Sequence, residues 1–169
     1  NFSFRNGPCS FYSGTKALGE EVLKDAKNCY IWRLRIPFNE EKSPRNYLQK
    51  LLHYSSLLEA ENSISHIDDY INSCLSSFTQ ECEPGIYNLT NSGSITTRQV
   101  VKWMKEEGVT DKEFNFFENE EDFMAKAAIT PRSNCVMDTS KAERNGIALR
   151  PVEEAVRQTL RKMREQVLA

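Results

Sequence analysis

Tyr12 and Lys16 are a pair whose residue types and spacing suit catalysis in this sequence of 169 residues. Four positions apart on a predicted helix, their side chains share one face. A phenol is a poor acid or base at neutral pH, but a cation one helical turn away favours its ionised form and suits it to proton transfer. Because the pattern is frequent by chance, an alternative interpretation is a solvated pair on an exposed helix face.

Three arginines are candidates for binding a phosphate group. Arg33 and Arg35 fall on one side of a predicted strand, and Arg35 lies near its carboxyl end, where open α/β sheets bind ligands. Structural ion pairs explain strand arginines equally well. Arg132 is the better candidate for a diphosphate, because it lies in a Pro-Arg-Ser-Asn loop and its planar guanidinium can bind phosphate oxygens in pairs.

Two other groups of polar residues are less persuasive as functional sites, and for the first of them we prefer a structural interpretation. His66, Asp68 and Asp69 resemble a catalytic cluster, but they open a predicted amphipathic helix, where acidic residues cap the helix and complement its dipole. Cys9 precedes the Tyr12 helix and is placed where a thiol can be reactive.

The composition excludes several classes of protein. A net charge of −2 with scattered Lys and Arg gives no nucleic-acid-binding face, and no apolar run approaches the roughly 18 residues that span a bilayer. Five cysteines without C-x-x-C spacing and two histidines make a zinc site improbable, so we expect no metal and reduced thiols in the cytoplasm. The first residues do not resemble a signal peptide and do not include an initiator Met, so we expect this sequence to be a piece of a longer chain. We expect residues 1–169 to form one α/β unit.

The predicted elements alternate between strands and helices, which indicates an α/β fold with a mainly parallel sheet. A helix over residues 10–27 begins at Ser10 and carries an apolar stripe of Phe11, Thr15, Leu18, Val22 and Ala26. A second helix, over residues 43–54, begins with Ser43 as its N-cap and Pro44. The other predicted strands are 29–38, 57–60, 85–90 and 114–117, and the other predicted helices start near residues 67, 97, 118, 138 and 151.

Several segments in order resemble one family. The run from Ser10 to Ala17 resembles the active-site helix of extended short-chain dehydrogenases/reductases, which follow it with a strand ending in Arg and Pro, as Arg35-Ile36-Pro37 does. Residues 44–50, 85–91 and 130–134 resemble, in this order, segments of dTDP-4-dehydrorhamnose reductases and of bifunctional UDP-4-keto-6-deoxyglucose 3,5-epimerase/4-reductases. As an ordered set over nearly the whole chain, they are far more specific than the Tyr12–Lys16 pair.

The resemblance implies the C-terminal portion of a Rossmann-like extended short-chain dehydrogenase with a small substrate-binding lobe. It implies hydride transfer from NADP or NAD to a sugar C4 ketone while Tyr12 donates the proton. Lys16 would contact the cofactor ribose, and the resemblance places Arg35 and Pro37 beside the cofactor. Asn39 and Arg132 would bind the nucleotide sugar.

The resemblance also gives Lys50 a role. In the bifunctional relatives a matching Lys works with an upstream Cys in epimerisation, by proton transfer at carbons beside the ketone. The residues themselves favour a non-catalytic interpretation. Lys50 lies opposite the apolar side of its predicted helix, where a lysine is simply exposed to solvent.

The sequence departs from complete family members. None of its seven glycines form the G-x-x-G-x-x-G turn that holds the cofactor pyrophosphate, and the upstream Ser/Thr and epimerase Cys are not in the sequence. We therefore expect the N-terminal cofactor-binding half to be absent, the chain alone to be inactive, and uncovered apolar faces to favour self-association. The alternatives are a non-catalytic regulatory or binding subunit of the same fold and a degenerate product without function.

Overall fold

The computed structural model describes residues 10–128 and 134–168. Cys9 and Arg132 lie outside the described residues. The helices are α1 (Phe11–Val22), α2 (Tyr47–His53), α3 (Ile67–Thr79), α4 (Thr97–Glu106), α5 (Glu120–Ala127), α6 (Ser140–Arg144) and α7 (Val152–Leu168). The strands are β1 (Tyr30–Arg33), β2 (Pro37–Phe38), β3 (Ser56–Leu57), β4 (Glu61–Asn62), β5 (Ser65–His66), β6 (Gly85–Asn88), β7 (Asn91–Ser92), β8 (Ile95–Thr96), β9 (Asn115–Phe116) and β10 (Leu149–Pro151).

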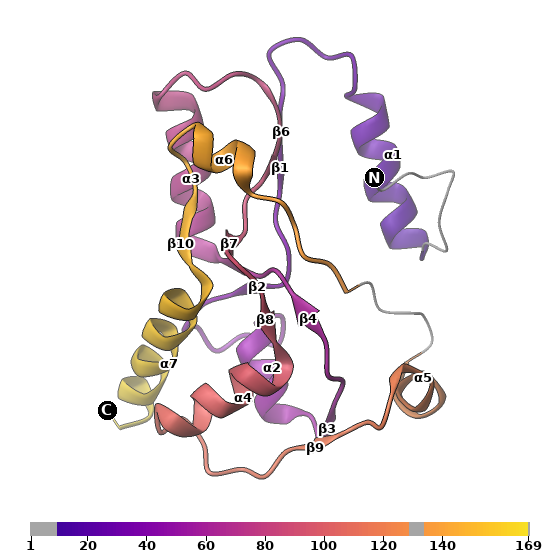
Figure 1. Ribbon diagram of the computed structural model, residues 1–169, viewed down its shortest axis with the longest axis vertical. Helices are drawn as coiled ribbons and strands as arrows, with labels where there is room; N and C mark the ends of the chain where they lie inside the picture. Colours follow the sequence, from indigo (N-terminus) through magenta and orange to yellow (C-terminus); the bar gives the residue numbers. More distant parts are fainter. Residues whose placement is uncertain (1–9, 129–133, 169) are drawn as a thin grey trace.

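The strands pair in twos, and the pairing is mainly parallel as predicted. Within the described residues β1 pairs with β6, β2 with β5, β3 with β9 and β7 with β10, all in parallel. The pair of β4 and β8 is antiparallel. The longest ladder, β1 with β6, stands between α1 on one side and α3 and α6 on the other (Figure 1).

Two hydrophobic cores lie along the chain. The smaller one packs the β1–β6 ladder against α3 and α6 through Tyr87, Leu89, Ala142, Ile147 and Leu149. The larger one joins α2, α4 and α7 (Figure 1). The apolar stripe predicted for the last helix is confirmed, because each of its members is buried in this larger core: Val152, Ala155, Val156, Leu160 and Met163.

The sequence placed some helix boundaries and one buried face wrongly. The first helix ends at Val22, short of the predicted residue 27, and the second begins at Tyr47 with Asn46 as its N-cap, so Ser43 is not the cap. The stripe expected to bury α1 is exposed: Phe11 is 90% and Val22 76% accessible, and the buried residues are Gly14 and Ala17. Spacing defines an apolar stripe, but the neighbouring elements decide which face is covered.

Local rules predicted other boundaries correctly. Thr96 caps α4 by accepting a hydrogen bond from the Gln99 amide at 3.2 Å. Gly108 follows the end of that helix with a φ of 70°, a conformation that favours glycine. No helix within residues 10–128 and 134–168 is long and apolar enough to cross a membrane.

The structural interpretation of this group is confirmed, with one difference: His66, and not a carboxylate, is the N-cap of α3, and Asp68 and Asp69 lie in the first turn, where they complement the helix dipole. The buried His66 ring accepts a hydrogen bond from the Asp69 amide at 3.4 Å. The Asp69 carboxylate accepts hydrogen bonds from Asn91 Nδ2 at 2.9 Å and from Arg150 Nε at 2.8 Å. Burial alone would raise the pKa of Asp69, but the hydrogen bonds with His66, Asn91 and Arg150 outweigh it and lower that pKa to about 2.

The Asp69 carboxyl makes stability depend on pH. Its pKa is about 2 in the folded protein, against an ordinary pKa of 3.8 in an unfolded chain. Its stabilisation is therefore complete above pH 4 or so and disappears as the pH falls towards about 2. We expect the free energy of unfolding to fall more steeply over this range for the wild type than for Asp69→Asn, measured by urea unfolding at a series of pH values.

An exposed carboxyl provides the matched control. Asp111→Asn removes a carboxyl that is exposed to solvent, so its curve should run parallel to that of the wild type. Parallel curves for the wild type and Asp69→Asn would contradict the prediction.

Candidate functional site

The Tyr12–Lys16 pair lies on the first turns of α1. Ser10 caps this helix by accepting a hydrogen bond from the Ser13 amide at 3.2 Å, which fixes where the helix begins. The Lys16 ammonium lies 5.6 Å from the centroid of the Tyr12 ring. Tyr12 is 70% exposed and Lys16 is also exposed, so both groups are open to a ligand. The structure therefore places the pair together, as its spacing predicted.

An ion pair joins α1 to the strand that follows it. Arg33, the last residue of β1, donates from Nε to Glu20 Oε1 at 2.8 Å and from its second nitrogen to the other carboxylate oxygen. The side chain hydrogen bond with Glu20 raises the pKa of Arg33, against the effect of burial. Arg33 is thus a structural residue, the alternative interpretation that the sequence left open for strand arginines.

The direction of α1 sets the location of the pair. Helix α1 and strand β1 run in opposite directions (Figure 1). The first turns of α1, with Tyr12 and Lys16, therefore lie towards the carboxyl end of β1, where Arg35 follows. That end of a parallel ladder is where open α/β sheets bind ligands.

The chain bends sharply directly after Arg35. Ile36 has a φ of 43°, in the left-handed region that a β-branched residue rarely adopts. Ser65 holds the backbone before this bend: its Oγ accepts from the Arg35 amide at 3.1 Å, and its own amide donates to the Arg35 carbonyl at 2.8 Å. Backbone strain of this kind persists only where the surroundings determine it, and it clusters at functional sites.

The Arg35 side chain is bonded to an amide. Its Nε and Nη2 donate to Asn62 Oδ1, at 3.2 and 2.5 Å. Burial lowers the pKa of the Arg35 guanidinium, and the nearby Cys135 opposes that effect. Cys135 follows Arg132 by three positions in the sequence, and its amide donates to the same Asn62 oxygen at 2.9 Å.

Pro37 and Asn39 lie just beyond the bend. Pro37 begins β2 and pairs with Ser65. Asn39 Oδ1 accepts hydrogen bonds from Asn46 Nδ2 at 3.1 Å and from the Glu41 amide at 3.2 Å. The Asn39 oxygen therefore shapes the loop before α2, and this role was not predicted from the sequence.

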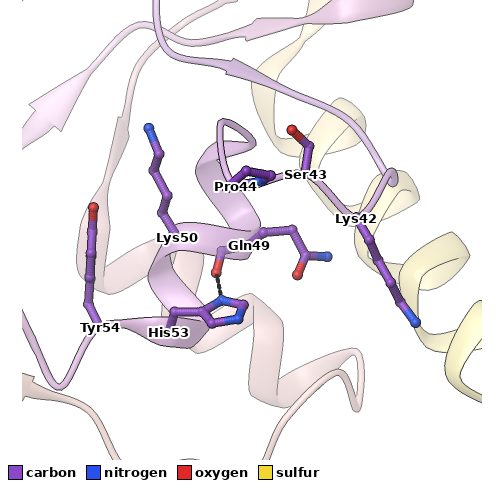
Figure 2. Close-up of a pocket in the computed structure, with 7 residues that line it drawn as sticks. All are labelled: Lys42, Ser43, Pro44, Gln49, Lys50, His53 and Tyr54. Atoms are coloured by element: carbon purple, nitrogen blue, oxygen red, sulfur yellow. Dashed lines mark hydrogen bonds between the residues drawn. The ribbon is translucent and has the colours of Figure 1, made fainter.

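Lys50 lines a surface groove on α2. The groove has a volume of about 460 Å³ and is lined by Lys42, Ser43, Pro44, Gln49, Lys50, His53 and Tyr54. Figure 2 shows the Lys50 and Tyr54 side chains extending in the same direction, while the His53 ring lies against the Gln49 carbonyl at 2.6 Å. Lys50 is exposed, with no carboxylate among the groove residues.

The predicted site residues come from several successive elements of the chain. Tyr12 and Lys16 lie on the first turns of α1, Arg35 and Pro37 follow β1, and Lys50 is on α2, which contacts the β2 strand that Pro37 begins. Sequence reasoning missed Asn62 and the strain at Ile36. Asn62 belongs to the polar run of residues 61–66, which reads as a solvated loop, yet Asn62, Ser63, Ser65 and His66 are all buried.

In sequence, the chain is similar to two plant enzymes, and no family model matches it. It is 29% identical over 148 residues to a trifunctional UDP-glucose 4,6-dehydratase/UDP-4-keto-6-deoxy-D-glucose 3,5-epimerase/UDP-4-keto-L-rhamnose reductase of Arabidopsis thaliana, covering 87% of this chain and 22% of the relative. It is 28% identical over 148 residues to a bifunctional dTDP-4-dehydrorhamnose 3,5-epimerase/dTDP-4-dehydrorhamnose reductase of the same plant, covering 87% of this chain and 48% of the relative. The chain thus spans less than half the length of either relative.

In structure, the chain matches part of larger reductases. The crystal structure of a UDP-rhamnose synthase from Acanthamoeba polyphaga mimivirus superposes with a TM-score of 0.83 at 22% identity, covering 96% of this chain and 57% of that one. A dTDP-4-dehydrorhamnose reductase from Bacillus anthracis in complex with NADP gives 0.70 at 16% identity, covering 95% and 57%. At such identities the likeness establishes the fold, which is part of a Rossmann-like reductase.

The sequence relatives and the shared fold agree with the ordered segments around Tyr12, Arg35 and Lys50. The chain is therefore homologous to a part of the dTDP-4-dehydrorhamnose reductases and of the UDP-rhamnose-forming epimerase/reductases.

Proposed function

We propose that this chain is the C-terminal catalytic and substrate-binding part of an NAD(P)-dependent nucleotide-sugar reductase or epimerase/reductase acting on a 4-keto-6-deoxyhexose nucleotide. The observation that carries the proposal is the Tyr12–Lys16 pair on α1 at the carboxyl end of β1. The two plant relatives, which reduce keto sugars of this kind by name, support it.

The residues around Tyr12 fit a nicotinamide cofactor. The exposed Tyr12 ring and Lys16 ammonium present a proton donor and a cation on one helix face. Arg35 and Pro37 lie at the same end of β1 and would flank the cofactor there. The solved Bacillus anthracis reductase of this fold carries NADP, but the choice between NADP and NAD belongs to residues that hold the adenosine end.

The proposed chemistry divides between cofactor and protein. When bound, the nicotinamide supplies hydride to the C4 ketone. Tyr12 donates its phenolic proton to the oxygen that becomes the C4 hydroxyl. Lys16 stabilises the phenolate that Tyr12 leaves behind and donates hydrogen bonds to the cofactor ribose. Arg35 provides positive charge at the edge where the cofactor would lie.

The substrate-binding residues extend the proposal. Arg132 would bind the nucleotide diphosphate, since a guanidinium can pair with two phosphate oxygens. Asn39 would contact the sugar through its Nδ2, because its Oδ1 already accepts two hydrogen bonds. Lys50 would carry epimerisation in an epimerase/reductase, moving a proton at a carbon beside the ketone.

Location and assembly complete the proposal. We place the protein in the cytoplasm, because Cys29, Cys74, Cys82 and Cys135 are free thiols, as in a reducing compartment.

We also propose self-association through α1. Phe11, Leu18 and Val22 are exposed on this helix, and exposed apolar patches of this kind mark interaction surfaces.

The test of catalysis is Tyr12→Phe in the full-length protein that contains this chain. Without the phenolic proton, the turnover number for reduction of the keto sugar should fall by about 10²–10⁴-fold, the usual size of a general-acid contribution. Steady-state oxidation of NAD(P)H measures it. Tyr70→Phe is the control, because the Tyr70 hydroxyl donates to the Trp32 carbonyl in the core and its loss should leave turnover unchanged. Unchanged turnover in Tyr12→Phe would favour the non-catalytic regulatory subunit instead.

Lys50→Met tests epimerisation separately. If Lys50 moves the proton, this variant should lose deuterium incorporation beside the ketone in heavy water while still reducing an already epimerised substrate. Mass spectrometry of the product measures both. Lys42→Met, on the same groove, is the control that should retain exchange. If Lys50→Met incorporates deuterium as fully as the wild type, Lys50 does not move this proton and is only a solvent-exposed surface residue.

Self-association is tested by charge on the α1 face. Val22→Asp places a carboxylate on the exposed stripe and should shift the protein towards the monomer in sedimentation equilibrium. Leu75→Asp, on an exposed position of α3, is the control that should leave the assembly state unchanged. A wild type that sediments as a monomer would contradict the proposal.

A further inference from the structure

One buried side-chain amide organises the loop between β2 and α2. Asn46 is only 4% exposed. Its Nδ2 donates to the Asn39 carbonyl at 2.7 Å, to the Glu41 carbonyl at 2.8 Å and to Asn39 Oδ1 at 3.1 Å. Its Oδ1 accepts from the Leu48 amide at 3.2 Å, which makes Asn46 the N-cap of α2. Asn46 therefore joins Asn39 to the helix on which Lys50 lies.

These partners fix the direction in which the Asn46 amide faces. Two of them are backbone carbonyls, which can only accept hydrogen bonds, and a third is a backbone amide, which can only donate. The Asn46 nitrogen must therefore face the loop, and its oxygen must face Leu48. Exchanging the two atoms would lose all three of these hydrogen bonds.

The Asn46 amide in turn fixes the orientation of the Asn39 side chain. Asn39 Oδ1 accepts from Asn46 Nδ2 at 3.1 Å and from the Glu41 amide at 3.2 Å. Because both partners donate, turning the Asn39 amide by half a rotation would set its own Nδ2 against two N–H groups. Among the residues that the structure describes, none accepts a hydrogen bond from Asn39 Nδ2. Asn39 is therefore set to donate to a ligand, and not to accept from one.

The same loop is held from a second side. Glu40, which follows Asn39, accepts from Lys162 Nζ on α7 at 2.7 Å. The backbone amide of Asn46 donates to the Ser43 carbonyl at 3.0 Å, which closes the turn before α2. A donor that is already held in one direction binds an acceptor with little further loss of entropy, so this pre-organisation suits a group that meets a ligand.

We propose that Asn46 is a positioning residue that fixes the Asn39 side chain so that Asn39 Nδ2 donates to an oxygen of the substrate sugar. The inference rests on the proposed function, which places Asn39 at the sugar. It assigns to Asn46 a role that acts through Asn39 and not through contact with the reacting atoms.

The discriminating variant is Asn46→Asp in the full-length protein that contains this chain. A carboxylate keeps the oxygen that caps α2, so the helix that carries Lys50 keeps its start. It also replaces the Nδ2 donor with an acceptor, so the Asn39 amide should turn, donate to the new carboxylate and present its oxygen to the substrate. The dissociation constant for UDP-rhamnose, or for dTDP-rhamnose if the wild type binds that nucleotide, should rise about tenfold, because an acceptor then faces an acceptor.

Two measurements separate this role from a structural one. Isothermal titration calorimetry with the nucleotide sugar should show the weakened binding, whereas titration with NAD(P)H should give the affinity of the wild type. The free nucleoside diphosphate, UDP or dTDP, lacks the sugar, so Asn46→Asp should bind it as tightly as the wild type does. A general loss of structure would weaken all three interactions together.

Three further variants test the route of the effect. Asn46→Ser keeps a capping oxygen and removes the donors without adding an acceptor, so the affinity for the nucleotide sugar should fall less than in Asn46→Asp. In an Asn39→Ala background, Asn46→Asp should cause no further change, because the group through which it acts is gone. The matched control is Asn119→Asp, at the exposed N-cap of α5, where Asn119 accepts from the Asp122 amide at 2.8 Å; its affinity should be that of the wild type.

The outcomes distinguish this inference from the proposed function. A wild-type protein that binds neither UDP-rhamnose nor dTDP-rhamnose overturns the proposed function and this inference with it. A wild type that binds the nucleotide sugar, with Asn46→Asp binding equally well, overturns the inference alone. An equal loss of affinity for the free nucleoside diphosphate or for NAD(P)H also overturns it, as does an undiminished effect in the Asn39→Ala background.

Discussion

The bend at Ile36 is the constraint on which the rest of the structure depends. Before it, β1 belongs to the ladder with β6 and to the smaller core; after it, β2 pairs with β5 and the chain enters the larger core. Ile36 itself packs against that larger core. A left-handed backbone at a β-branched residue is unfavourable. The partial burial of Ile36 and the two hydrogen bonds between Ser65 and Arg35 hold it in place.

The same bend determines what the candidate site can do. It ends β1 abruptly, so Arg35 lies just beyond the strand terminus, at the edge where open α/β sheets bind ligands. The antiparallel direction of α1 brings Tyr12 and Lys16 towards that terminus (Figure 1). Asn62 and Ser65, both buried, connect this edge to β4 and β5. The site is thus assembled from short segments, each held by a few hydrogen bonds.

Several arginines form ion pairs with carboxylates, whereas the contacts at the candidate site are of a different kind. Arg33, Arg150 and Arg157 are held by the carboxylates of Glu20, Asp69 and Glu107, and these pairs join neighbouring elements. At the candidate site Lys16 lies beside the Tyr12 ring, and the amide oxygen of Asn62 accepts hydrogen bonds from Arg35. Carboxylates thus lock helices and strands together, whereas these two contacts involve an aromatic ring and a neutral amide.

The sequence by itself determined the α/β class, the homologous family and the Tyr12–Lys16 pair, because each depends on local spacing or on ordered segments. The capping by Thr96, the glycine after α4 and the buried stripe of α7 follow from the same local rules. Only the tertiary structure decided that the apolar stripe of α1 is exposed and that Asn62 binds Arg35 and Cys135 together. The physical reason is that burial and side-chain partners across 27 or 73 positions of sequence depend on how distant segments pack, and periodicity carries no information about that packing.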